Sequence, residues 1–200
     1  MIAVIDYGMG NLRSVQKALE YLGFEAVVTE DRETVLRADS VVLPGVGAIS
    51  DALHRLISSG MDKVVAEVIL QNKPFLGICL GMQLLYDKSH EGGLFDGFKI
   101  ISGEVVRLPS INGLKVPHMG WNRIFFRDDP LFFGLSDSVY AYFVHSYFVD
   151  ASRGEAIATT SYGVDITAAV RKNKVYGVQF HPEKSGDIGL RILNNFGRMK

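Results

Sequence analysis

The chain has 200 residues, of which 48% are hydrophobic and 22% are charged, and its formal net charge is −1. These values are typical of a single globular domain. A charge so close to zero predicts no nucleic acid and no membrane as a partner, and no apolar run reaches the ~18 residues of a membrane-spanning helix. The only cysteine, Cys79, cannot form an internal disulfide, so we expect a reducing, cytoplasmic setting.

The first half of the sequence alternates between short apolar runs and segments with helical spacing of apolar residues. Strands are expected at 2–7, 24–29, 40–44 and 74–79, and helices at 12–22, 31–38, 48–59, 62–72 and 80–88. Asn11 is expected to cap the first of these helices. Strands that alternate with helices predict a parallel sheet that is covered on both faces.

The second half of the sequence has a different character. Its aromatic and β-branched runs at 139–149, 155–161 and 168–180 predict antiparallel strands, and a last helix is expected at about 185–196. No stretch resembles a linker. We therefore predict one α/β domain over residues 1–200, with a mostly parallel central sheet, flanking helices and an antiparallel, strand-rich second half.

Two glycine pairs follow predicted strands, in Gly8–Gly10 and in Gly45–Gly47. A dinucleotide-binding loop needs a third glycine three residues after the second, and those positions hold Arg13 and Ser50. Gly8–Gly10 fits a tight turn equally well. In Gly45–Gly47 the backbone N–H groups can approach a ligand oxygen closely, which makes this segment a candidate oxyanion-binding strand beside a nucleophile.

Cys79 lies between Gly77 and Gly81, where a predicted strand meets a predicted helix. This is the pattern of a nucleophile elbow, whose tight turn leaves no room for flanking Cβ atoms. The N-terminus of a helix stabilises a thiolate, and the amide of Leu80 is placed as one oxyanion donor. A free cysteine is also among the most buried residue types, so the elbow alone does not establish catalysis.

His181 and Glu183 flank Pro182 near the end of the chain. In an extended segment their side chains point the same way, so the carboxylate would fix the imidazole tautomer and stabilise the imidazolium form. Alone, this segment would more often be a solvated strand end. Together with the Cys79 elbow it completes a set of nucleophile, base and orienting carboxylate.

The other four histidines give weaker signals. His54 and His90 lie in polar surroundings and are expected at the surface, whereas His118 and His145 lie in strand-like segments and fit either the core or the site. No cluster of histidine, cysteine and acidic residues has metal-ligand spacing. We therefore predict neither a metal nor a cofactor.

The elbow at Gly77–Gly81 and the segment His181–Glu183 resemble the triad class of glutamine amidotransferases. Further segments narrow this resemblance: Asp6–Asn11, Leu43–Gly47, Pro117–Asn122, Tyr142–Tyr147 and His181–Ser185. From Ile2 to the last predicted helix, the chain is similar to the glutaminase subunits of imidazole glycerol phosphate synthase.

The resemblance implies a reaction with glutamine as substrate. Cys79 would attack the side-chain amide carbon of glutamine, His181 would protonate the departing ammonia, and Glu183 would orient His181. Water would then hydrolyse the glutamyl thioester. The ammonia would pass to a separate β/α-barrel chain, the synthase partner, which would form imidazole glycerol phosphate and aminoimidazole carboxamide ribotide in histidine biosynthesis.

The resemblance also implies which residues surround this chemistry. The oxyanion hole would comprise backbone N–H groups of Val46, Gly47 and Leu80. Glutamine would contact Gly45, Gln83, Glu91, His145, Ser146 and Tyr147. The synthase partner would contact Asn11, Met119, Trp121 and Lys184. Gln83 lies one helical turn after Cys79 on the predicted helix, which agrees with its role, whereas Glu91 also fits a solvated charge.

Three alternatives remain open. The first is a glutaminase of another pathway, such as pyridoxal phosphate or anthranilate synthesis, although the segments Pro117–Asn122 and Leu43–Gly47 argue against this. A catalytically silent partner-binding subunit would not need an intact Cys79, His181 and Glu183. A cysteine hydrolase that acts on peptides would need no partner.

Overall fold

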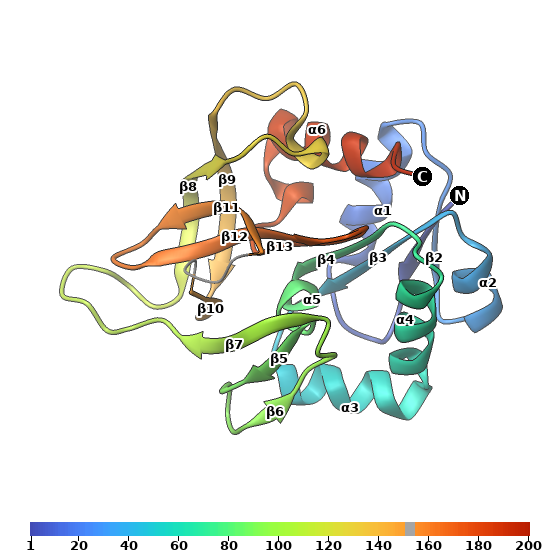
Figure 1. Cartoon of the computed structure of the whole chain (residues 1–200), viewed down its shortest axis with the longest axis horizontal. Coiled ribbons are helices and arrows are strands. Elements are labelled where there is room, and N and C mark those ends of the chain that lie inside the picture. Colours follow the sequence, from blue (N-terminus) through green and yellow to red (C-terminus); the bar gives the residue numbers. More distant parts are fainter. Residues whose placement is uncertain (151–154) are drawn as a thin grey trace.

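The structure is a computed structural model and describes residues 1–150 and 155–200. Its described strands form one nine-stranded and one four-stranded sheet (Figure 1). The large sheet has the order β2-β1-β3-β4-β13-β12-β11-β8-β9. Its strands are β1 (Ile2–Ile5), β2 (Ala26–Thr29), β3 (Ser40–Gly45), β4 (Phe75–Cys79), β8 (His118–Phe126), β9 (Ser138–His145), β11 (Ala156–Ser161), β12 (Asp165–Lys172) and β13 (Val175–Val178).

The large sheet is parallel in one half and antiparallel in the other. Neighbouring strands from β2 to β13 pair in parallel, and those from β13 to β9 pair antiparallel. Strand β13 belongs to both halves, because it lies parallel to β4 with Gly177 opposite Gly77. The chain therefore leaves β13 at the sheet edge where it leaves β4, which brings His181 to the same edge as Cys79.

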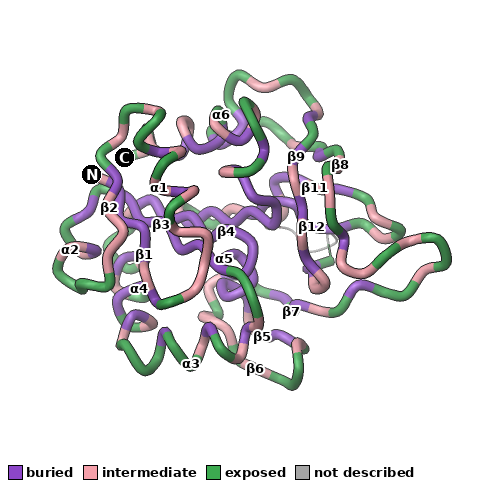
Figure 2. Tube along the Cα trace, turned by 180° about the vertical axis from the view of Figure 1, so that it is seen from behind, coloured by how far each residue is buried: buried purple, intermediate pink, exposed green. Residues whose placement is uncertain are grey.

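Helices cover both faces of the parallel half (Figure 1). On one face lie α1 (Leu12–Tyr21) and α6 (Gly186–Gly197), and on the other lie α2 (Arg32–Arg37), α3 (Ile49–Ser59) and α4 (Met61–Leu70). Strands β1, β3 and β4 are buried along their whole length (Figure 2). Burial on both faces explains why these strands are continuous apolar runs. None of the described helices is long and apolar enough to cross a membrane.

The four-stranded sheet has the order β10-β7-β5-β6. Its strands are β5 (Tyr86–Ser89), β6 (Phe95–Asp96), β7 (Ile101–Arg107) and β10 (Tyr147–Val149). Tyr86, Ile101, Val105 and Val149 join the same core cluster as helices α2, α3 and α4. This small sheet therefore adds apolar residues to the core on the face of the large sheet that α2, α3 and α4 cover.

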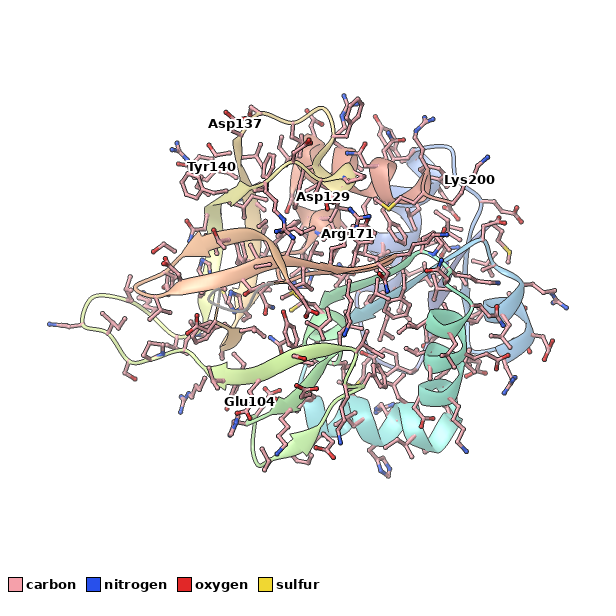
Figure 3. All side chains as sticks on the ribbon, in the orientation of Figure 1. Glu104, Asp129, Asp137, Tyr140, Arg171 and Lys200 are labelled. Carbon is pink, nitrogen blue, oxygen red and sulfur yellow. The ribbon has the colours of Figure 1, made fainter. Side chains whose placement is uncertain are left out.

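An ion pair ties the antiparallel half to the turn between β8 and β9. In Figure 3 Arg171 of β12 reaches Asp129, with Nη1 and Oδ2 3.0 Å apart. The other oxygen of Asp129 accepts a hydrogen bond from the backbone N–H of Leu131, at the short helix η1 (Pro130–Phe132). The buried carboxylate is thus paired and hydrogen-bonded, as a buried charge requires.

Most predicted elements of the first half are present, but the helix expected at 80–88 is wrong. Helix α5 spans only Leu80–Gln83, and the chain then enters β5, which pairs in parallel with β7. The long run expected at 139–149 is also divided at Ser146, so that β9 and β10 belong to different sheets. In both places long-range strand pairing overrides the local pattern.

Asn11 occupies the predicted N-cap position of α1, but without the expected side-chain bond. The side chain of Asn11 makes no capping hydrogen bond to α1. Its Nδ2 instead donates to Oε1 of Glu183, 3.3 Å away and on the far end of the chain. The Asn11 side chain therefore bonds to a residue distant in sequence and not to the backbone of α1.

Candidate active site

Cys79 lies on a strained turn between β4 and α5. Its backbone has φ +55° and ψ −106°, which a residue with a side chain rarely adopts. A Cβ atom at Gly81 would lie 1.9 Å from the carbonyl oxygen of Leu43, and one at Gly77 would lie 2.4 Å from that of Gly81. The two glycines are therefore required by the close approach of backbones. Gly45 of β3 pairs with Cys79 in the sheet register.

The segment after β13 folds differently from the prediction. His181 is extended, but residues Pro182–Lys184 form a short 3-10 helix, η2, in place of an extended run. This turn brings the Glu183 carboxylate back onto the imidazole, with Oε1 2.8 Å from Nδ1 of His181. The side chains of His181 and Glu183 are 2% and 1% exposed, so solvent does not weaken the pair.

The surroundings of His181 favour its protonated form. Burial lowers the pKa of His181, but the nearby Cys79 sulfur and the hydrogen-bonded Glu183 carboxylate outweigh burial and raise this pKa to about 9. Nδ1 faces Glu183, and Nε2 has no hydrogen-bond partner among the described residues. An imidazolium beside a thiol favours the thiolate, which is the nucleophilic form.

Cys79 and His181 line a cavity of about 380 Å³, a size that suits a small ligand. Its other lining residues are Val46, Gly47, Leu80, Gln83, Glu91, Pro117, Val144, His145, Ser146 and Tyr147. Of the residues expected to contact glutamine, Gly45 alone does not line the cavity. It is buried at the end of β3, where an added Cβ would meet the Tyr7 hydroxyl at 2.7 Å and Leu80 at 2.8 Å. Pro117 and Val144 were not expected from the sequence.

Glu91 forms one wall of the cavity and is not a freely solvated charge. Its Oε2 accepts a hydrogen bond of 2.9 Å from the backbone N–H of Ile49, at the N-terminus of α3. Partial burial raises the pKa of this carboxyl, while that hydrogen bond opposes the change. The contact holds the loop before β6 against the N-terminus of α3, beside the cavity that Glu91 lines.

A chain of buried and part-buried hydrogen bonds supports other residues of the cavity lining. Nδ1 of His145 lies 2.9 Å from the carbonyl oxygen of Tyr147, which also accepts from Nε2 of Gln83 at 3.0 Å. Behind it, Nδ1 of His118 lies 2.9 Å from Nε2 of His145. Of the two histidines that fitted either core or site, His145 thus lines the cavity and His118 supports it. His54 and His90 are exposed, as expected.

The residues expected at a partner interface lie around Tyr142. Met119 and Trp121 of β8 are 62% and 56% exposed, and the ring of Trp121 meets that of Tyr142 edge-on at 6.2 Å. Lys184 is exposed and its Nζ lies 6.0 Å from the centre of the Tyr142 ring. Met119 pairs with Val144, a cavity-lining residue, so this surface borders the cavity. Asn11 lies half-buried beneath it, against Glu183.

Two further side chains near the sulfur were not found from the sequence. Nε2 of Gln179 lies 3.6 Å from Sγ of Cys79, and the buried hydroxyl of Tyr7 has no hydrogen-bond partner among the described residues. Burial and the charge of Cys79 raise the pKa of Tyr7. Gln179 is two residues before His181, the same spacing that drew attention to Glu183, whereas no sequence signal points to Tyr7.

Comparison with known proteins shows the family of this chain. Residues 3–199 match the family described as "Glutamine amidotransferase class-I". The chain is 51% identical to the "Imidazole glycerol phosphate synthase subunit HisH" of Caldanaerobacter subterraneus subsp. tengcongensis, over 100% of this chain and 98% of the relative. It is 50% identical to the protein of the same name from Geobacter sulfurreducens, over 100% of this chain and 99% of the relative.

Solved structures show the same fold. A crystal structure described as a glutamine amidotransferase aligns with a TM-score of 0.76 at 20% identity, covering 100% of both chains. A structure of PurLQS from Thermotoga maritima aligns with a TM-score of 0.74 at 17% identity, covering 98% of this chain and 96% of the other. The α/β fold class expected from the sequence is thereby confirmed. With the family matched over almost its whole length and relatives identical at half of their positions, the chain belongs to the class-I glutamine amidotransferases, among the HisH subunits of imidazole glycerol phosphate synthase.

Proposed function

We propose that this chain is a glutaminase that supplies ammonia to the synthase subunit of an imidazole glycerol phosphate synthase in the cytoplasm. Full-length relatives with the name of that enzyme's HisH subunit support the assignment. The observation that carries the chemistry is the buried His181–Glu183 pair, with a distance of 2.8 Å, beside the strained Cys79 turn. Residues 1–200 act in this proposal as one domain.

The proposed reaction begins with the thiolate of Cys79. It attacks the side-chain amide carbon of glutamine, and the backbone N–H groups of Leu80 and of the Val46–Gly47 segment stabilise the resulting oxyanion. The proton on Nε2 of His181 passes to the departing nitrogen, which leaves as ammonia. His181 then takes a proton from water, which attacks the thioester carbon and releases glutamate and the thiolate. Glu183 remains ionised and holds the imidazole throughout.

The cavity walls provide groups for both ends of glutamine. The Glu91 carboxylate suits the α-ammonium group, and it is already fixed by the Ile49 amide. Gln83 is 5% exposed and lies beside the cavity, and the backbone of His145–Tyr147 offers hydrogen-bonding groups on the other wall. Gly45 does not line the cavity. In this proposal it supports the Cys79 turn as its partner in the neighbouring strand.

The synthase partner, a β/α-barrel chain in this proposal, docks on the surface formed by Met119, Trp121 and Lys184. An apolar anchor with a charge at its rim is typical of a specific interface. Asn11 extends this surface toward the catalytic pair through its hydrogen bond with Glu183. Ammonia then moves from the cavity into the barrel without entering bulk water.

The decisive experiment measures glutamine hydrolysis by the isolated chain and by its complex with a candidate barrel chain. We expect the complex to be much faster, and Trp121→Ala to weaken the complex. The matched control is Tyr21→Ala, because Tyr21 is a 79% exposed aromatic residue at the end of α1, away from the Cys79 edge of the sheet.

Each rival predicts a different result. Equal turnover with and without the barrel chain would identify a free-standing glutaminase. No hydrolysis in either sample would identify a silent subunit. Hydrolysis of peptides without a partner would identify a general cysteine hydrolase, and stimulation only by the synthase of another pathway would reassign the pathway.

A further inference from the structure

Gln179 is a buried amide in direct contact with the nucleophilic sulfur. It follows the last residue of β13 and has no solvent exposure. Its Nε2 lies 3.6 Å from Sγ of Cys79, and its Oε1 lies 2.9 Å from Nε2 of Gln83. Glutamine hydrolysis as described above assigns no task to this side chain.

The orientation of the Gln179 amide follows from its neighbours. The carbonyl oxygen of Tyr147 can only accept, so Nε2 of Gln83 must face it at 3.0 Å. The second hydrogen on that Nε2 then points at Gln179, whose Oε1 must be the acceptor. The NH₂ group of Gln179 is thereby directed at Cys79. Reversing either amide would set two donors or two acceptors against each other.

Two contacts of the sulfur distinguish its two protonation states. Sγ lies 4.0 Å from the carbonyl oxygen of Val144, which accepts a hydrogen bond from the neutral thiol but repels a thiolate. The NH₂ group of Gln179 has the opposite preference, because a donor stabilises the negative sulfur. Because Gln179 has no solvent exposure, this preference is stronger than it would be at the surface.

We propose that Gln179 is a positioning residue that holds the Cys79 thiolate by donating an N–H group to its sulfur, with Gln83 and the Tyr147 carbonyl fixing the direction of that donor. This inference deepens the proposed function and rests on it. The sulfur of the glutamyl thioester is uncharged, so the bond is strongest before attack and again when the thiolate leaves.

The test uses three variants. Gln179→Met removes the donor and keeps the length of the side chain. Gln179→Glu can still accept from Gln83 but places a carboxylate beside the sulfur. The control is Thr167→Val in the adjacent strand β12, since the Thr167 hydroxyl is buried and has no partner among the described residues.

The first measurement is the rate of Cys79 alkylation by iodoacetamide across a pH series. We expect the half-maximal pH to rise by about one unit in Gln179→Met, as for the loss of a hydrogen bond to a charged group. It should rise further in Gln179→Glu and stay unchanged in Thr167→Val. If Gln179→Met does not fold, Gln179→Glu alone decides the result.

The second measurement is glutamine turnover by the complex. In Gln179→Met we expect kcat to fall roughly tenfold at neutral pH and to recover toward wild type at alkaline pH, with KM little changed. Coincident alkylation curves for wild type and both Gln179 variants would overturn the proposal, as would uniform slowing with an unmoved midpoint. Because alkylation needs no glutamine, this failure is distinct from a failure of the proposed function.

Discussion

Replacing Glu183 with glutamine tests how the charge of this carboxylate acts on His181. The change keeps an oxygen that can accept from Nδ1 but removes the negative charge. The His181 pKa of about 9, compared with an ordinary value of 6.5, corresponds to about 3 kcal/mol in favour of the imidazolium. Cys79 and Glu183 together produce this rise in the pKa, and burial opposes it. Loss of the Glu183 charge should therefore cost about 1–2 kcal/mol, or roughly 5- to 30-fold in kcat.

The assay follows kcat and KM for glutamine in the complex with the barrel chain across a pH series. We expect a lower kcat, a nearly unchanged KM and an alkaline limb that moves to lower pH. Glu104→Gln is the control, because Glu104 forms a similar 2.7 Å contact with His90 that is half exposed and outside the cavity. A rise in KM alone would show that Glu183 binds substrate, and an unmoved alkaline limb would refute the electrostatic reasoning.

Two further predictions concern stability. Gly81→Ala would place a Cβ atom 1.9 Å from the Leu43 oxygen, so we expect a loss of roughly 3 kcal/mol or more in the free energy of unfolding; an unmoved denaturation midpoint would contradict the packing argument. Burial lowers the pKa of His118 to about 4, and burial with nearby His118 and His181 lowers that of His145 to about 3 despite its hydrogen bond to Tyr147. The unfolded chain then binds more protons below its ordinary histidine pKa of 6.5, so stability should fall as the pH drops from 6.5 toward 4. His118→Phe should flatten this slope in denaturant titrations, and an unchanged slope would assign the acid sensitivity to other groups.

Local patterns in the sequence predict the parallel half of the fold well. The helices and strands around β1, β3 and β4 are set by apolar periodicity, which is a property of neighbouring residues. The segment Leu84–Tyr86 is different, since a short apolar run fits a helix or a strand. The pairing of the strand that follows, β5, with β7 decides the outcome, and that pairing is invisible in the local sequence.

The candidate site likewise contains some residues that local sequence predicts and others that only the fold brings together. The Cys79 turn is visible because the two glycines that it requires lie within two positions of Cys79 in the sequence. His181 and Glu183 meet as predicted, although through a 3-10 turn and not through an extended strand. Gln179 is missed because its partner is 100 positions away, and a lone buried glutamine gives no chemical signal until the fold brings a sulfur to it.

The most direct test of the whole account is the role of Cys79. A glutamine-analogue electrophile should label this residue alone, and Cys79→Ala should lose glutamine hydrolysis by on the order of 10⁴- to 10⁶-fold. The variant should keep the wild-type denaturation midpoint and still bind the barrel chain. Wild-type turnover of glutamine by Cys79→Ala, or label found on another residue, would contradict the proposed mechanism.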